Sequence, residues 1–127
     1  MDSNYECIRE NDFILFKISG FFVADAIDRY KEAIISVLKS MDAQGQPYKV
    51  LFDLRGLRPL DRPSIVAIIE ITKCYGDSLF VARVGCVFDS TITMLQHLRA
   101  SWDLFEIGPS TRIFGDIDEC RQWLKEQ

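Results

Sequence analysis

The chain has 127 residues, of which 48% are hydrophobic and 27% are charged, and its formal net charge is −4. These values are typical of one globular domain with a buried core, and they argue against extensive disorder. The acidic balance gives no electrostatic reason to expect nucleic-acid binding, and no apolar run is long enough to insert into a membrane. The polar N-terminus "MDSNYECIRENDF" does not have the pattern of a secretory signal. We therefore expect a single cytoplasmic domain over residues 1–127.

The cysteines are widely spaced, with no C-x-x-C motif, and each lies in an apolar pattern. This arrangement favours free thiols in a reducing compartment over disulfides or a metal site. We expect four buried, unreactive thiols, which are Cys7, Cys74, Cys86 and Cys120.

The first third of the chain predicts a hairpin followed by a helix. The segments "YECIR" and "FILFKIS" are strand-like, and residues 10–12 between them favour a turn. After Gly20, apolar residues recur at three- and four-residue steps, which predicts a helix from about Ala24 to Lys39. The segment "DAQGQP", residues 42–47, is the clearest loop in the chain.

The rest of the chain alternates strands with helices. The run "YKVLFDL" lacks polar alternation, which is typical of a strand covered on both faces. We then predict a helix over Arg62–Tyr75, a strand "VARVGCVF", a helix over Thr91–Trp102, a strand "TRIF" and a helix over Ile117–Lys125. Helix N-caps are predicted at Asp61, at Asp89 or Ser90, and at Asp116. The order of elements predicts an α/β fold with mostly parallel pairing.

The "VLFDLRGL" strand, the aspartate-capped helix after it and the closing "RIFGDIDECRQWL" resemble STAS domains, over residues 5–124. These are the SpoIIAA-like modules of anti-sigma-factor antagonists and of anion-transporter tails. The resemblance implies one STAS-like domain over residues 1–127, with an N-terminal β-hairpin, alternating βα units, a mixed, mostly parallel sheet and about four helices. It also implies a regulatory function through binding of a protein partner or a second copy.

Phosphorylatable members of this family carry Asp-Ser-Ser-Gly at the start of the second helix, with the first serine as phosphoacceptor. The matching positions here are Asp61, Arg62, Pro63 and Ser64. Arginine stands in place of the acceptor, so the chain resembles a branch that lacks the switch. Ser64 could take a phosphate in the first helical turn, although a plain capping role explains it better.

Three aspartates, Asp53, Asp89 and Asp116, follow predicted strands, where α/β folds place functional groups. They could hold magnesium for phosphoryl transfer, or they could simply begin turns and helices. Asp53 lies inside the strand end and is the hardest to explain by capping. The sequence has no phosphate-binding loop, no dinucleotide fingerprint and no nucleophile elbow, and it predicts no cofactor.

The polar segment Arg55–Ser64, which we call the elbow, joins the third strand to the second helix. Its three arginines could hold a phosphate or carboxylate of a partner, or their stems could cover apolar surface. The candidate partner-binding or anion-binding residues are Asp53, Arg55, Arg58, Asp61, Arg62 and Ser64.

The second helix is apolar nearly all round its axis, and two phenylalanines are adjacent after Gly20. Burial between the sheet and neighbouring helices would explain both features, as would an interface. The candidate contact residues are Phe21, Phe22, Ile65, Ile68 and Ile69.

Three functions follow from these observations. We prefer a non-catalytic protein-binding module that uses the elbow and the flanking apolar helix. The second is a carrier or sensor of a small hydrophobic or anionic ligand, and the third is a magnesium-dependent phosphoryl-transfer enzyme. The lone histidine, His97, has no nucleophile or orienting acid near it in sequence and is expected to be structural.

Overall fold

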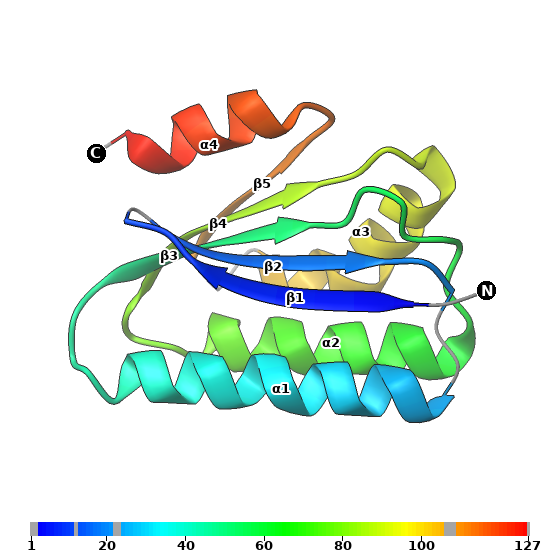
Figure 1. Cartoon of the computed structure of the whole chain (residues 1–127), viewed down its shortest axis with the longest axis horizontal. Helices are drawn as coiled ribbons and strands as arrows, with labels where there is room; N and C mark the ends of the chain where they lie inside the picture. The colour runs from blue at the N-terminus through cyan, green and yellow to red at the C-terminus, as the bar shows by residue number, and fades with distance from the viewer. Residues whose placement is uncertain (1–2, 12, 22–23, 106–108, 127) are drawn as a thin grey trace.

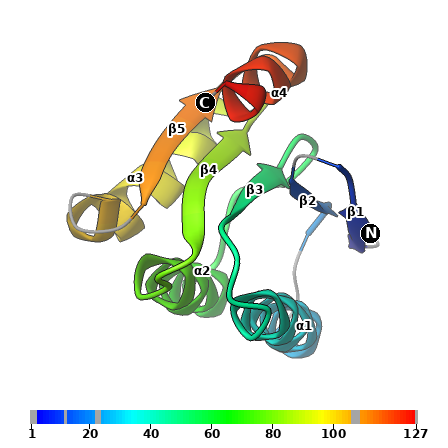
Figure 2. The same cartoon turned by 90° about the vertical axis from the view of Figure 1, so that its left-hand side faces the viewer.

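The computed structural model describes residues 3–11, 13–21, 24–105 and 109–126. Five strands form one sheet in chain order, and helices cover both of its faces (Figures 1 and 2). The strands are β1 (Asn4–Arg9), β2 (Ile14–Ser19), β3 (Tyr48–Asp53), β4 (Val81–Val87) and β5 (Ser110–Phe114). The helices are α1 (Ala24–Asp42), α2 (Arg62–Gly76), α3 (Thr91–Phe105) and α4 (Ile117–Lys125).

The pairing of strands confirms the predicted hairpin and the mostly parallel sheet. β1 is antiparallel to β2, and every later neighbouring pair is parallel. α1 runs three residues beyond the predicted Lys39, to Asp42. The hydroxyl of Tyr48 donates to the carbonyl of Leu38 and to Oδ1 of Asp42, which stabilises this last turn.

The two faces of the sheet carry cores of unequal size. Alternate residues of β2–β4, such as Phe16 and Val50, pack toward α1, α2 and α3 in the larger cluster. Their neighbours, such as Leu15 and Leu51, pack against α4 in the smaller one. Burial on both faces explains why "YKVLFDL" shows no polar alternation, as the sequence predicted.

Helix α4 alone covers the second face, and polar contacts fix both of its ends. At its start Asp116 accepts from the N–H of Asp118 at 2.7 Å, which confirms the predicted N-cap. At its end Lys49 donates to the carbonyl of Leu124, and Arg83 donates to that of Trp123 at 2.6 Å. These cations lie at the negative end of the helix dipole, where they stabilise it.

The prediction of four buried thiols is wrong for Cys7. All four cysteines are free; Cys86 and Cys120 are buried, Cys74 is partly buried and Cys7 is exposed. Cys7 lies on the edge strand β1, where five of the six residues are exposed. Burial raises the pKa of the Cys120 thiol to about 12, which keeps it protonated and unreactive.

Candidate functional site

The elbow lies at the carboxyl ends of the parallel strands, and its first turn is tied to the end of β2. The N–H of Gly20 donates to the carbonyl of Gly56 at 2.9 Å, and the N–H of Arg58 donates to the carbonyl of Gly20 at 3.1 Å. Gly56 has a φ of 81°, a backbone conformation that other residues rarely adopt. The turn therefore requires glycine at this position.

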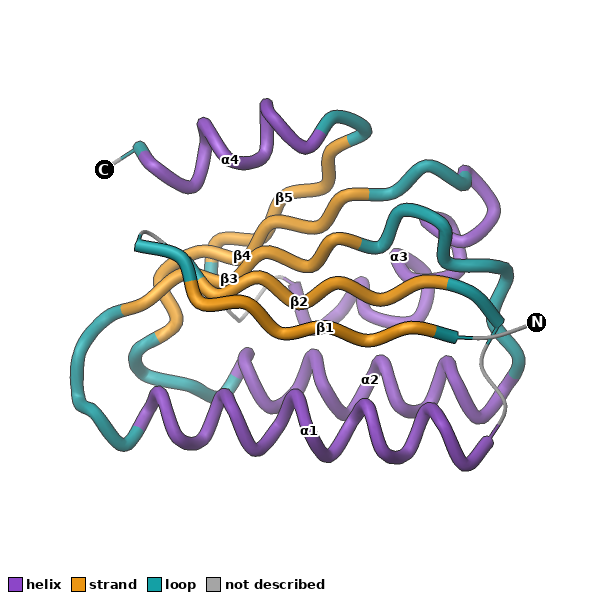
Figure 3. The backbone as a smooth tube through the Cα atoms, in the orientation of Figure 1, coloured by secondary structure: helices purple, strands orange, loops and turns teal. Residues whose placement is uncertain are grey.

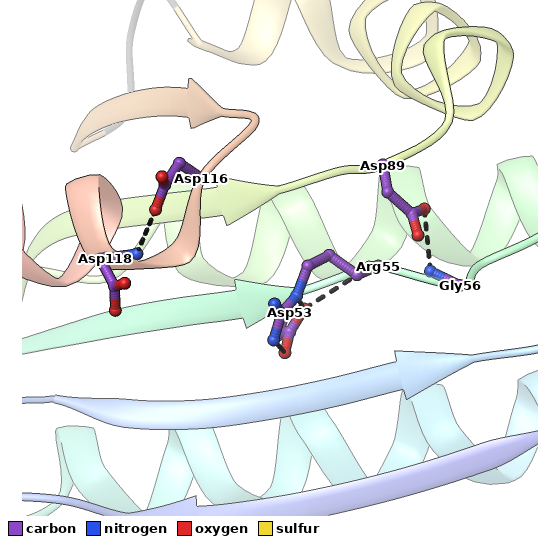
Figure 4. A network of polar contacts seen from close by, with 6 residues as sticks. All are labelled: Asp53, Arg55, Gly56, Asp89, Asp116 and Asp118. Atoms are coloured by element: carbon purple, nitrogen blue, oxygen red, sulfur yellow. Dashed lines mark hydrogen bonds and ion pairs between the residues drawn. The ribbon is translucent and has the colours of Figure 1, made fainter.

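The segment before and at the start of α3 fixes the rest of the elbow. Oδ1 of Asp89 accepts from the N–H of Gly56 at 2.9 Å (Figure 4), and Oγ1 of Thr93 donates to the carbonyl of Leu57 at 3.1 Å. The side-chain amide of Gln96 binds both the N–H and the carbonyl of Leu60, at 2.7 and 3.1 Å. With its backbone held at these points, the elbow is a rigid connection that presents side chains in fixed positions.

Asp53 and Arg55 form a bidentate ion pair at the end of β3 (Figure 4). Nε and Nη2 of Arg55 lie 2.8 and 2.9 Å from the two carboxylate oxygens, and Asp53 is only 2% exposed. Burial raises the pKa of Asp53, but hydrogen bonds from the side chain and backbone of Arg55 outweigh it and hold the pKa below its ordinary value. Arg55 is thus engaged within the protein, whereas the sequence placed it among the partner-binding candidates.

The three aspartates that follow strands have separate structural partners. Asp53 binds Arg55, Asp89 binds the backbone of Gly56, and Asp116 caps α4. Within the part of the chain that the structure describes, no group of three or more histidine, cysteine, aspartate or glutamate side chains could hold a metal ion. The magnesium hypothesis stays a prediction, and the geometry of these carboxylates lends it no support.

Asp61 and Ser64 act together at the start of α2. Oδ1 of Asp61 accepts from the N–H of Ser64 at 2.9 Å, and Pro63 follows in the first turn, so the predicted N-cap is confirmed. Hydrogen bonds from Ser64 hold the pKa of Asp61 below its ordinary value. Ser64 is 1% exposed, so its hydroxyl is closed to a modifying enzyme in this conformation.

Unlike Arg55, the elbow residues Arg58 and Arg62 are exposed and form no ion pair with any of the residues that the structure describes. The guanidinium of Arg58 lies 5.8 Å from the ring centre of Phe21, which is 44% exposed. Arg62 lies at a shallow hollow between α1 and α2, beside Val66 and Glu70. This part of the surface combines cations with exposed apolar groups, a composition typical of interfaces.

Helix α3 has an inverted pattern of burial. Its buried stripe is polar: Thr93 and Ser101 are fully buried, and His97 is 6% exposed. Its outer surface carries Ile92 and Leu95, which are 63% and 54% exposed. A helix that turns its polar residues inward and large apolar residues outward is the reverse of the usual surface helix.

The polar stripe of α3 is accommodated by specific partners. Thr93 binds the elbow carbonyl of Leu57, and the hydroxyl of Ser101 lies 3.2 Å from that of Thr72 on α2. The ring of His97 packs 5.4 Å from that of Phe88, and burial lowers its pKa to about 4. His97 is therefore a neutral core residue near pH 7, as expected from the sequence.

The apolar surplus of α2 is largely taken up by packing. Ile65 and Ile68 are half-buried against the main core, and Ile69 is half-buried as well. Of the other contact candidates, Phe21 is exposed, and Phe22 lies outside the described residues. The large apolar side chain of α2 that is exposed is Val66, which is 48% exposed and was not among the candidates.

A small apolar cavity lies between the sheet and helices α1–α3. Its volume is about 40 Å³, and its lining includes Ile34, Phe52, Ile68 and His97. Engineered protein cavities that bind benzene measure about 150 Å³, so this space is too small for a hydrophobic ligand of that size. A carrier of such a ligand would need this cavity to enlarge.

Sequence reasoning missed Val66, Ile92 and Leu95 as surface residues. The signal was present in "TITMLQHL", where Ile92 and Leu95 share one helical face and Thr93 and His97 share another. The periodicity of this segment predicts a helix with two different faces, but it does not show which face is exposed to solvent. No helix within the described residues has the length and apolar character needed to span a bilayer.

No family model matches the chain, and no curated protein matches it either. Solved structures do match. An anti-sigma factor antagonist from Mycobacterium paratuberculosis superposes with a TM-score of 0.70 and 13% identity, covering 98% of this chain and 96% of the other.

An uncharacterized protein of the DUF3478 family from Shewanella loihica, described as having a SpoIIAA-like fold, superposes with a TM-score of 0.65 and 18% identity. The match covers 96% of this chain and 93% of the other. The chain therefore has the SpoIIAA-like α/β fold that the resemblance to STAS domains implied, shared with an anti-sigma factor antagonist.

Proposed function

We propose that this protein is a non-catalytic regulatory module that binds a protein partner through the elbow and α3. The observation that carries the proposal is the inverted burial of α3, which leaves Ile92 and Leu95 exposed while Thr93 and His97 are buried. Exposing two large apolar groups costs free energy unless a partner covers them. The likeness in fold to an anti-sigma factor antagonist supports the same class of function.

The chemistry of the surface indicates the chemistry of the partner. Arg58 and Arg62 are exposed on the elbow, Arg62 toward the hollow between α1 and α2, and the apolar side chains of α3 flank Gln96, which holds the elbow. A segment with apolar residues next to carboxylates would complement both parts. Because arginine stands at position 62 and Ser64 is buried, we propose that binding is not switched by phosphorylation of the elbow.

A charge-reversal experiment tests this proposal. The double variant Arg58→Glu with Arg62→Glu changes the exposed cations and leaves the Asp53–Arg55 pair intact. We expect this double variant to lose the proteins that the wild-type chain captures from native extract, and the single variant Leu95→Gln to capture them more weakly than the wild type. The matched control, Arg29→Glu with Lys125→Glu, makes the same charge change at exposed sites on α1 and α4 and should retain them.

Capture that is unchanged in the Arg58/Arg62 variant would contradict the proposal, provided that circular dichroism shows both variants folded. A carrier or sensor of a small hydrophobic or anionic ligand remains the second candidate, and the cavity between the sheet and α1–α3 would have to enlarge to hold a hydrophobic one. Native mass spectrometry of protein purified without denaturation would reveal a bound ligand. For the enzyme hypothesis, calorimetry at millimolar magnesium would show whether the metal binds.

A further inference from the structure

The edge strand β1 has an exposed, unpaired side. It is the first strand in the sheet order, and Figure 2 shows it at the outer edge, beyond α1. Five of its six residues are exposed, and the strand contains neither proline nor lysine. An open strand edge carries unpaired N–H and C=O groups on which another strand can add. Proline and charged side chains, lysine above all, protect against this, and of these β1 has Glu6 and Arg9.

The hairpin shows which backbone groups of β1 point outward. The N–H of Glu10 donates to the carbonyl of Phe13 at 3.0 Å, immediately beside the ladder. Because hydrogen-bonded pairs alternate along an antiparallel ladder, every second residue counted back from Glu10 bonds to β2. The other residues, which are Tyr5, Cys7 and Arg9, direct their N–H and C=O groups away from the sheet.

We propose that a second copy of this chain pairs antiparallel with β1, about a two-fold axis that passes between the two Cys7 residues. In this register Cys7 lies opposite Cys7 of the other copy, and Tyr5 lies opposite Arg9. All three outward-facing residues then exchange backbone hydrogen bonds with outward-facing residues. The Arg9 guanidinium also comes beside the aromatic ring of Tyr5, which is a favourable contact.

Charge distinguishes this register from its neighbours. An axis centred on Glu6 would set two Glu6 carboxylates opposite each other, and one centred on Ile8 would set Glu6 opposite Glu10. Like charges directly opposite on a sheet are destabilising. The register centred on Cys7 sets Glu6 opposite Ile8, so no two carboxylates lie directly opposite each other, and the second strand covers Ile8, which is 42% exposed.

This interface is separate from the proposed partner-binding surface. The elbow follows β3, and α3 packs against α2 on the far side from β1 (Figure 2). One short strand buries less than a standard interface, so we expect association that depends on concentration between about 10 µM and 1 mM. Both copies would leave their elbows open.

Sedimentation velocity of the full chain over this range is the first test. We expect a shift from the monomer mass of 14.6 kDa toward twice that value. Mild oxidation of the associated protein should join the copies at Cys7, since opposed residues in such a pair have Cα atoms about 5.5 Å apart, within disulfide range. A monomer at every concentration, or a cross-link that maps to Cys74 instead, would overturn the proposal.

Two substitutions at Ile8 test the register. In the proposed pairing Ile8→Lys sets a cation opposite Glu6 of the other copy, and Ile8→Glu sets an anion there. We expect Ile8→Lys to lower the dissociation constant and Ile8→Glu to raise it, with about tenfold between them. A change in the same direction for both variants would exclude this register, whatever partner the elbow binds.

A proline variant separates pairing between copies from pairing within the hairpin. Cys7→Pro removes an outward N–H that makes no bond to β2, and edge strands tolerate proline at such positions. We expect this variant to keep the circular dichroism of the wild type and to remain monomeric. Association that survives Cys7→Pro in a folded chain would place the interface elsewhere and overturn the proposal.

Discussion

The carboxylate of Asp53 is 2% exposed and depends on Arg55 for its polar partners. Asp53→Asn keeps the shape of the side chain but removes the charge that binds the guanidinium. We expect the free energy of unfolding to fall by about 1–3 kcal/mol, the usual effect of breaking a buried polar pair. Urea denaturation measures it, and Asp28→Asn, at a side chain that is 68% exposed, is the control with little effect.

The same ion pair predicts a dependence on acid. The folded-state pKa of Asp53 lies below the ordinary value of 3.8, so the pair stabilises the protein above that pH. This contribution is lost as the pH falls through the folded-state pKa. The difference in stability between the wild type and Asp53→Asn should therefore shrink below a pH of about 4. A difference that is constant with pH would show that the charge is not involved.

His97 predicts a second, separate dependence on pH. Burial lowers its pKa in the folded protein to about 4, against an ordinary value of 6.5. The unfolded chain therefore takes up a proton first, and stability declines as the pH falls from 6.5 toward 4. The loss reaches about 3 kcal/mol. In the variant His97→Leu, the free energy of unfolding should no longer show this decline between pH 6.5 and 4. Chemical denaturation at several pH values in that range measures it.

At the scale of elements, the contact between α4 and β4 depends on the absence of a side chain at position 85. An added Cβ on Gly85 would overlap Sγ of Cys120, which is fully buried on α4. Gly85→Ala should therefore destabilise the protein by about 1–3 kcal/mol through overpacking.

A double-mutant cycle isolates that contact. Cys120→Ala removes the sulfur, so Gly85→Ala should cost much less in its presence, and the coupling measured by chemical denaturation should be favourable by about 1 kcal/mol or more. If the effects of the two substitutions were additive, the loss of stability in Gly85→Ala would not come from the close approach of α4 to β4.

The unequal faces of the sheet govern the stability of the whole molecule. α1, α2 and α3 share the larger core, while α4 holds its face alone with a small cluster and the contacts of Lys49 and Arg83 (Figure 1). In native-state hydrogen exchange we expect α4 amides to exchange through local opening, before those of α2 and β3. Arg83→Met should accelerate exchange in α4 alone. Equal protection of α2 and α4 would contradict this ranking.

Much of the fold follows from local pattern. The hairpin, the doubly covered β3 and the aspartate caps of α2 and α4 all leave signals in neighbouring residues, and the structure confirms them. The exposure of Cys7 at the sheet edge could not be predicted in this way, because nearby residues in the sequence do not show how much of the sheet α1 covers.

The contacts of the candidate site could be predicted from the sequence less well than the fold. The role of Arg55 depends on the direction of a side chain two residues from its partner, Asp53. The outward-facing Ile92 and Leu95 reverse the usual rule for amphipathic helices. Only the packing of α3 against α2 and the elbow, through Thr93, decides which face of the helix meets solvent.

The exposed turn between α1 and β3, residues 43–47, lies at the opposite end of the strands from the elbow (Figure 3). A fluorescent reporter or an affinity tag could be spliced into that turn, since surface tips of this kind accept inserted sequence. Such a fusion would leave the elbow arginines and the outer face of α3 undisturbed, although the turn lies beside Arg9 at one end of β1. A molecule labelled in this turn could thus report on capture of a partner by the opposite end of the sheet.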